Sequence, residues 1–217
     1  LLDMSSSLAK AYSKLGRHDE AIELAEETQR QSRDRRGPEH PSTLTAASDL
    51  AGILSAADGH EDAVVLLEKV LPQMQKLLGP DHYETLTCLA NLAVACQGVD
   101  RREEAILHLE QALQGRRKSL GEDHPDTLHS MYLLGAVYSK QGEYVKAEPL
   151  LTEAYQGFAK RDSRIGTLYE QAQVRTTLTA LIRLYEMWNQ PEKAAMWEEK
   201  LKLLKEEFQT GNGDESS

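Results

Sequence analysis

One eight-residue motif occurs three times in this chain: GPEHPSTL at 37–44, GPDHYETL at 79–86 and GEDHPDTL at 121–128. Each copy begins 42 residues after the one before it. Self-similarity at a fixed period of about 20–50 residues is typical of solenoids, in which each unit buries its apolar face only against its neighbours. The spacing therefore predicts a repeat array that works through an extended surface.

Each period between the motifs contains two apolar patterns with helical spacing. The clearest pair is Leu128, Met131, Leu134, Val137 and Tyr138, followed by Ala147, Leu150, Leu151, Ala154 and Tyr155. Steps of three and four residues indicate amphipathic helices. Gly142 stands between the two, with equivalents at Gly16 and, shifted by one, Gly59. Because glycine adopts the left-handed conformation that ends a helix, each period predicts a helical hairpin.

The motif itself marks helix boundaries. Gly37, Gly79 and Gly121 are placed to end the second helix of each hairpin, and Pro41 and Pro125 suit the first turn of the next helix. A tyrosine replaces that proline in the middle copy.

The residues at fixed offsets resemble the tetratricopeptide repeat. Its large-small pair, aromatic, turn glycine and two alanines correspond to Leu134, Gly135, Tyr138, Gly142, Ala147 and Ala154. A period of 42 with the GxxHPxTL motif is similar to the variant found in kinesin light chains, since the usual unit has 34 residues. The resemblance implies an all-α fold, a right-handed α-α superhelix (solenoid) of five helical hairpins.

The fifth hairpin is out of step with the others. Leu181, Ile182, Tyr185, Asn189 and Ala194 match the fourth repeat at a spacing of 47, so five residues are inserted after Lys160. We expect a longer loop or a longer helix there. The ending LTALIRLYEMWNQPEKAAMWEEKL is similar to the last repeat of the tetratricopeptide tails of bacterial Ser/Thr kinases.

These patterns predict one array over 1–208, followed by a polar, disordered tail at 209–217. The expected hairpins span about 1–36, 41–78, 83–120, 125–161 and 166–208. Because the first residues already fall inside a repeat, we expect the chain to be a fragment of a longer protein.

Composition excludes several classes of function. The formal charge of −10, from 25 Lys plus Arg against 35 Asp plus Glu, argues against a nucleic-acid or anionic-membrane surface. No apolar run approaches the ~18 residues of a membrane span, and no secretory signal pattern is present, so a cytoplasmic protein is expected. Cys88 and Cys96, eight residues apart on one helix, cannot form a disulfide and are predicted to be reduced and buried.

The sequence offers no catalytic or cofactor motif. His40, His82 and His124 occupy equivalent places, but successive repeats hold them too far apart to share one metal ion, whose ligands lie at ~2 Å. We interpret each as bonding within its own loop. We therefore predict that the protein is not an enzyme, with no catalytic, cofactor or metal site.

The resemblance implies that the first helix of each hairpin lines a concave groove. The family's groove offsets correspond here to these candidate site residues: Ser6, Lys10, Lys14, Asp49, Ser55, Asn91, Gln97, Tyr132, Ser139, Thr179 and Arg183. Small and polar side chains leave room for a peptide backbone, and amides bond both its donors and its acceptors. We predict a scaffold that binds an extended peptide or protein segment, although only Asn91 matches the asparagine that recurs in the kinesin light chain groove.

Two alternatives remain open. The array could be the regulatory region of a larger protein such as a bacterial signalling kinase. It could also self-assemble through apolar ends, formed by Met4 and Leu8 at one end and by Trp197, Leu201 and Phe208 at the other.

Overall fold

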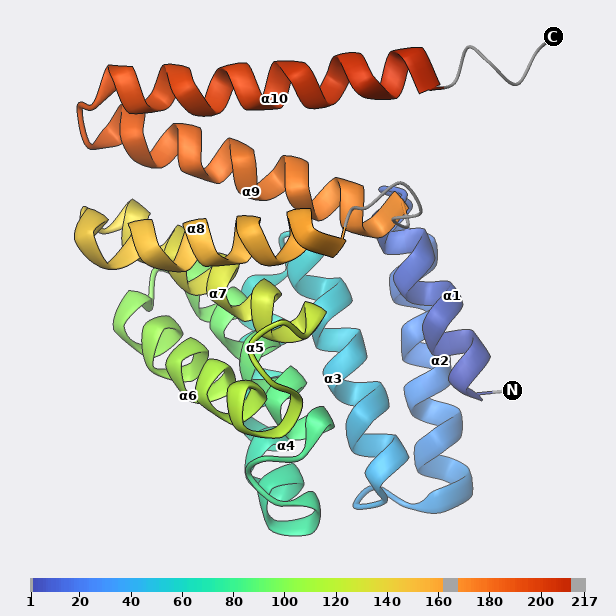
Figure 1. Cartoon of the computed structure of the whole chain (residues 1–217). Coiled ribbons are helices and arrows are strands. Elements are labelled where there is room, and N and C mark those ends of the chain that lie inside the picture. The colour runs from blue at the N-terminus through green and yellow to red at the C-terminus, as the bar shows by residue number, and fades with distance from the viewer. Residues whose placement is uncertain (1, 162–167, 212–217) are drawn as a thin grey trace, which may run out of the picture. The chain divides into compact units, whose positions relative to one another are not determined.

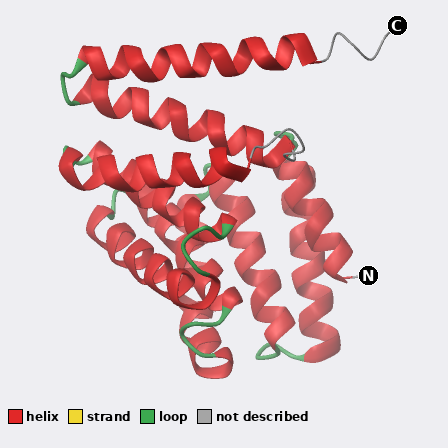
Figure 2. Cartoon of the chain, viewed as in Figure 1, coloured by secondary structure: helices red, strands yellow, loops and turns green. Residues whose placement is uncertain are grey.

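The computed structural model describes residues 2–161 and 168–211, including the side chains of 4–160 and 171–206, and these ranges form ten helices and no strand (Figure 1). In chain order the helices are α1 (Leu2–Lys14), α2 (His18–Arg36), α3 (Pro41–Ala56), α4 (His60–Leu78), α5 (Tyr83–Gly98), α6 (Arg102–Leu120), α7 (Pro125–Lys140), α8 (Tyr144–Arg161), α9 (Leu168–Met187) and α10 (Pro191–Gly211). Within each of the two described ranges, short loops join successive helices (Figure 2), and the predicted all-α fold of five hairpins is confirmed. Within the described ranges, none of the helices combines the length and apolar character that a membrane crossing requires.

The chain divides into two compact units, Leu1–Leu120 and Gly121–Ser217. Within each unit, every helix packs against the next one along the chain. The first helices of successive hairpins also contact each other: α1 with α3, α3 with α5, and α7 with α9. First helices therefore form one layer of each unit and second helices the other.

The repeated motif ends and starts helices as predicted. Gly37, Gly79 and Gly121 have φ angles of 92°, 96° and 86°. With ψ of 162° at Gly37 and 159° at Gly79, the backbone is in a region open almost only to glycine. Pro41 and Pro125 are the first residues of α3 and α7.

The motif histidines cap the helices that follow them. The Nδ1 atoms of His40, His82 and His124 each accept a hydrogen bond of 3.2 Å from the backbone N–H two residues later. Each histidine thus acts as an N-cap: its side chain accepts a hydrogen bond from a backbone N–H that has no acceptor within the first turn of the helix. The predicted bonding of each histidine within its own loop is confirmed.

Each hairpin turns at a residue with positive φ. In register with Gly16 and Gly142, this residue is Asp58, Asp100 or Asn189, with φ of 63°, 63° and 54°. The assignment of this role to Gly59 was wrong, since its φ is −79°. Aspartate and asparagine tolerate the left-handed region better than most residues, which is why the turn survives without glycine.

Small residues bring paired helices together. A Cβ atom at Gly135 would lie 2.7 Å from Cγ of Leu151, so glycine allows the close approach of α7 and α8 at this position. Cys88 and Cys96 are both buried and unbridged, as predicted, and burial raises the pKa of the Cys88 thiol to about 12.

The last hairpin absorbs the insertion partly by lengthening its first helix. Helix α9 has 20 residues, whereas α7 has 16. It ends at Met187, the counterpart of Lys140, but starts four residues before Ala172, the counterpart of Pro125. The segment 162–167 lies outside the described residues. Helix α10 continues through Gly211, into the segment predicted to be disordered, and 212–217 lie outside the described residues.

Candidate functional site

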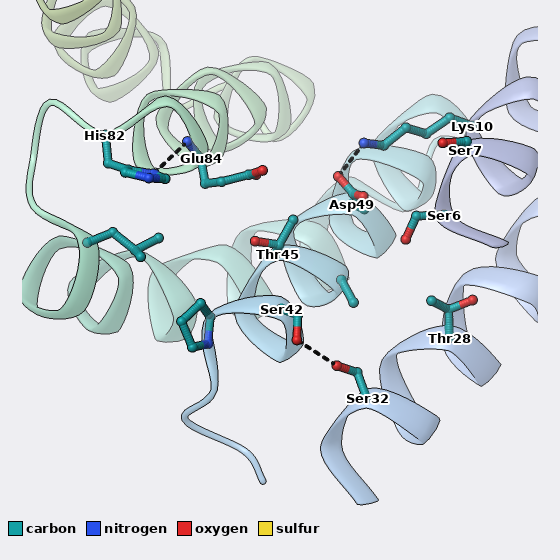
Figure 3. A pocket seen from close by; sticks show the side chains of 13 residues that line it. Ser6, Ser7, Lys10, Thr28, Ser32, Ser42, Thr45, Asp49, His82 and Glu84 are labelled. Atoms are coloured by element: carbon teal, nitrogen blue, oxygen red, sulfur yellow. Dashed lines mark hydrogen bonds and ion pairs between the residues drawn. The ribbon is translucent and has the colours of Figure 1, made fainter. Parts of the chain in front are cut away.

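A pocket of about 540 Å³ lies in the unit Leu1–Leu120, where α1, α2 and α3 approach the start of α5 (Figure 3). We call it the α3 pocket. Hydroxyl-bearing and charged side chains dominate its wall: Ser6, Ser7, Lys10, Thr28, Ser32, Pro41, Ser42, Thr45, Ala46, Asp49, Leu78, His82 and Glu84. Its volume falls in the range of roughly 300–1,000 Å³ that is typical of ligand sites.

A hydroxyl network fixes the end of the pocket formed by α2 and α3. Ser32 Oγ lies 3.1 Å from Thr43 Oγ1, and Thr43 donates to the carbonyl oxygen of Gly37 over 2.9 Å. Arg36 donates to Ser42 Oγ over 2.7 Å. The loop between α2 and α3 therefore holds the first turn of α3 in place.

An ion pair joins α1 to the middle of α3. Lys10 Nζ lies 2.7 Å from Asp49 Oδ1, and the two side chains are 50% and 8% exposed. Burial raises the pKa of Asp49, while the charge of Lys10 and the hydroxyl of Ser6 oppose that rise. The lysine is thus the main group that keeps this buried carboxylate charged.

Glu84 brings a second carboxylate to the pocket from the first turn of α5. Burial and, after it, repulsion from Asp49 raise the pKa of Glu84; Lys10, His82 and a hydrogen bond with Thr45 act in the opposite direction. In Figure 3 the side chains of Glu84 and Asp49 extend into the same space. The two acids share one lysine.

A second hollow of about 240 Å³ continues along the same helices and shares Lys10 and Asp49 with the α3 pocket. Asn91 lies in its wall and donates to the carbonyl oxygen and the hydroxyl of Ser48, over 3.1 Å and 3.3 Å. A Cβ atom at Gly52 would lie 3.2 Å from Asn91 Nδ2, so glycine makes room for this amide. We call the two hollows together the α1–α3–α5 groove.

The predicted groove residues of this unit fall into two groups. Five line the groove: Ser6, Lys10, Lys14, Asp49 and Asn91. Ser55 is only 6% exposed and Gln97 is half-buried, and neither lines either hollow. Ser55 is therefore corrected to a buried position outside both hollows.

In the unit Gly121–Ser217 the candidates lie on α7 and α9, which pack together. Tyr132 is half-buried, and the nearby charge of Arg183 opposes the rise that burial causes in its pKa. Thr179 donates its hydroxyl to Arg175 O over 2.9 Å. Ser139 is buried at 5% exposure, so it too is corrected to an interior position.

Sequence reasoning missed the pocket residues at the helix starts, notably Thr45, His82 and Glu84. The spacing of residues in the sequence could have identified Thr45 and Glu84. Thr45 precedes Asp49 by four residues, and Glu84 precedes Asn91 by seven, so both extend the same helical face toward the N-terminus.

The repeat architecture and the face formed by the first helices define a class of protein. The profile of the tetratricopeptide repeat matches residues 1–74, 56–118 and 103–160. The chain belongs to the tetratricopeptide-repeat family, whose fold is generally a protein-interaction scaffold.

Solved structures with this fold include kinesin light chain-like repeat proteins. A putative kinesin light chain with nearly identical repeats from Podosopora anserina is 28% identical to this chain, with 96% of both chains covered and a TM-score of 0.73. BtubC (BKLC) from P. vanneervenii shares 18% identity over 100% of this chain and 83% of its own, with a TM-score of 0.79. A Rap protein complexed with competence and sporulation factor shares 14% identity over 95% and 64%, with a TM-score of 0.64. Among curated proteins, none matches the sequence.

Proposed function

We propose that this protein is a non-catalytic scaffold that binds an extended segment of a partner protein in the α1–α3–α5 groove. The observation that carries the proposal is the pair of hollows, of about 540 and 240 Å³, that share Lys10 and Asp49. Their continuity gives an elongated site along several first helices. An elongated site fits a peptide chain better than a compact small molecule.

The polar groups of the groove support a backbone ligand. The Nδ2 group of Asn91 donates to the carbonyl oxygen and the hydroxyl of Ser48, which fixes the plane of the amide and leaves Oδ1 as the acceptor for a ligand N–H. Gly52, which has no side chain, leaves space beside the Asn91 amide. A fixed acceptor needs little further ordering when a ligand binds, which favours affinity.

The comparison with the Rap protein also supports the proposal. That protein was solved in complex with competence and sporulation factor, so a fold of this kind accommodates a bound partner. At 14% identity, the comparison supports only a shared fold. The kind of ligand that this chain binds must be inferred from its own residues.

Cross-linking tests the proposal. A photoreactive amino acid at Thr87, in the wall of the second hollow, should capture a ligand selected from a random peptide library. The same group at Glu103, exposed on the second helix α6, is the matched control. Capture at Glu103 with none at Thr87, together with unchanged affinity in an Asn91→Ala variant, would overturn the groove as the binding site.

Self-association is a second candidate function, favoured by the apolar surface of α1. Met4 and Leu8 are 73% and 46% exposed. The other predicted end offers less, since Trp197 is buried against Tyr155, Leu201 is half-buried and Phe208 lies outside the described side chains. If α1 pairs with a second copy, light scattering will show a mass that rises with concentration, and a Leu8→Lys change will abolish that rise. A constant monomer mass excludes this function.

A further inference from the structure

Asp49 is a buried carboxylate that the repeat does not require. At the corresponding positions of the other first helices the chain has Ser7, Asn91, Leu133 and Ala180, all of which are uncharged. Burying a charged group disfavours folding unless its partner compensates for lost hydration, and here that partner, Lys10, is half exposed. An acid held in this way at a ligand-sized pocket points to a role in binding.

The α3 pocket has a shortage of positive charge. Lys10 pairs with Asp49 and acts on Glu84 through its charge, while His82 is the other basic side chain in the wall. With both carboxylates ionised, the charge of Lys10 balances only one of the two. The most favourable occupant is therefore a cation, whose charge would compensate for the hydration that Glu84 loses through burial.

The pocket is also partly apolar, which distinguishes between kinds of cation. Pro41, Ala46 and Leu78 contribute to its wall beside the carboxylates. Lysine and arginine combine an apolar stem with a charged end, and they bury the stem while the end meets a polar group. A bare metal ion would gain nothing from the apolar wall and would meet the ammonium group of Lys10.

We propose that the α3 pocket selects a basic side chain of the bound segment, a lysine or an arginine whose charged end pairs with Glu84 and Asp49. This inference rests on the proposed function, because it assigns the chemistry of one position in a peptide held by the α1–α3–α5 groove. The remaining side chains of the ligand are recognised elsewhere along the groove.

The test begins with selection from a random dodecapeptide library against the whole chain at pH 7 and low salt. The strongest peptide is then synthesised with a fluorescent label, together with a version in which its basic residue is replaced by glutamine. Binding of both is measured by fluorescence anisotropy to the wild type and to Glu84→Gln. Asp126→Asn is the matched control, since Asp126 stands in the same first-turn position of α7.

We expect one basic residue to be enriched in the selected peptides. Glu84→Gln should weaken binding of the basic peptide about tenfold, as loss of one charge-assisted hydrogen bond implies, and leave the glutamine peptide unchanged. Asp126→Asn should bind both peptides as the wild type does. Glu84→Lys should shift the selection toward an acidic residue at the same place, and circular dichroism should show that every variant is folded.

Peptides that bind without a basic residue, or an equal effect of Glu84→Gln on both peptides, would overturn the basic pocket and leave the scaffold function standing. A chain that selects no peptide at all would overturn the scaffold function, and the pocket assignment with it.

Discussion

The two units carry different chemistry at matching places on their first helices. In the unit Leu1–Leu120, the groove position on α3 is Asp49, paired with Lys10. In the unit Gly121–Ser217, the same position is Leu133 on α7 and Ala180 on α9. Both units are built from helical hairpins of the same repeat, so the difference between them at this position lies in the side chains.

The units also differ in how they hold an acid. Burial raises the pKa values of Asp49 and Glu84 in the groove of the first unit. Glu148 of the second unit has a lowered pKa, first because it accepts a hydrogen bond of 2.6 Å from Tyr185 and then because Lys193 lies 3.1 Å away. In the groove of the first unit, burial outweighs the neighbours that favour the charged acids, whereas hydrogen bonds with Tyr185 and Lys193 favour the charged form of Glu148.

Of the changes considered, removal of the Lys10 side chain should alter the stability of the protein most. A Lys10→Met change leaves Asp49 buried without its counterion, and we expect a loss of about 2–3 kcal/mol in the free energy of unfolding at pH 7. Adding Asp49→Leu, which installs the residue found at this position in α7, should restore stability. Urea denaturation measures both variants. A single variant as stable as the wild type would show that Lys10 does not support Asp49.

Two glycines test whether helix packing is alike in both units. A Cβ atom would lie 2.3 Å from Leu128 Cδ2 at Gly157, and 2.4 Å from Leu86 Cδ2 at its counterpart Gly115. After the gain in helix propensity is subtracted, Gly157→Ala and Gly115→Ala should each destabilise the protein by about 1–2 kcal/mol. Gln156→Ala, an exposed neighbour, is the control for propensity in thermal denaturation. Stabilisation at either glycine would contradict the close contact.

The histidine caps should behave alike in the two units. His40→Ala and His124→Ala should each lower the free energy of unfolding by about 1 kcal/mol, because a backbone N–H loses its acceptor. His40→Asn and His124→Asn provide a side-chain oxygen in the same place and should lose much less. Chemical denaturation measures the free energy of unfolding of all four variants. If the asparagine variants were as unstable as the alanine variants, capping would be excluded as the reason for the loss of stability.

The smallest expected effect is an opposite response of the two units to pH. The raised pKa values of Asp49 and Glu84 mean that their contribution to stability is present in acid and is lost as pH rises above about 4. The lowered pKa of Glu148 means that its contribution is present above about pH 4 and is lost as pH falls through its folded value.

Melting temperatures across this pH range should show the difference. Relative to the wild type, Glu84→Gln should improve as pH rises, whereas Glu148→Gln should worsen. Tyr185→Phe is the matched control for Glu148, since it removes the hydrogen bond and retains the carboxylate. Parallel curves for the two glutamine variants would contradict the opposite environments.

The periodicity of the sequence was enough to predict the hairpins, because Gly37, Gly79 and Gly121 occupy backbone conformations that few other residues adopt. The resemblance to the tetratricopeptide family also implied that Asp49 and Asn91 are groove residues, and both line the α1–α3–α5 groove. It did not show that Ser55 and Ser139 are buried, because residues on the same face of a helix differ in how closely the neighbouring helices cover them.

By itself, then, the sequence determined the class of fold and the series of five hairpins, since these depend on local backbone conformation and on spacing along the chain. Only the tertiary structure decided which groove residues meet. Lys10, Asp49 and Glu84 come from three hairpins, and the ion pair of Lys10 with Asp49 and the raised pKa values of the two acids depend on how α1, α3 and α5 pack. Electrostatic interactions and burial act through space, and no spacing along the chain specifies them.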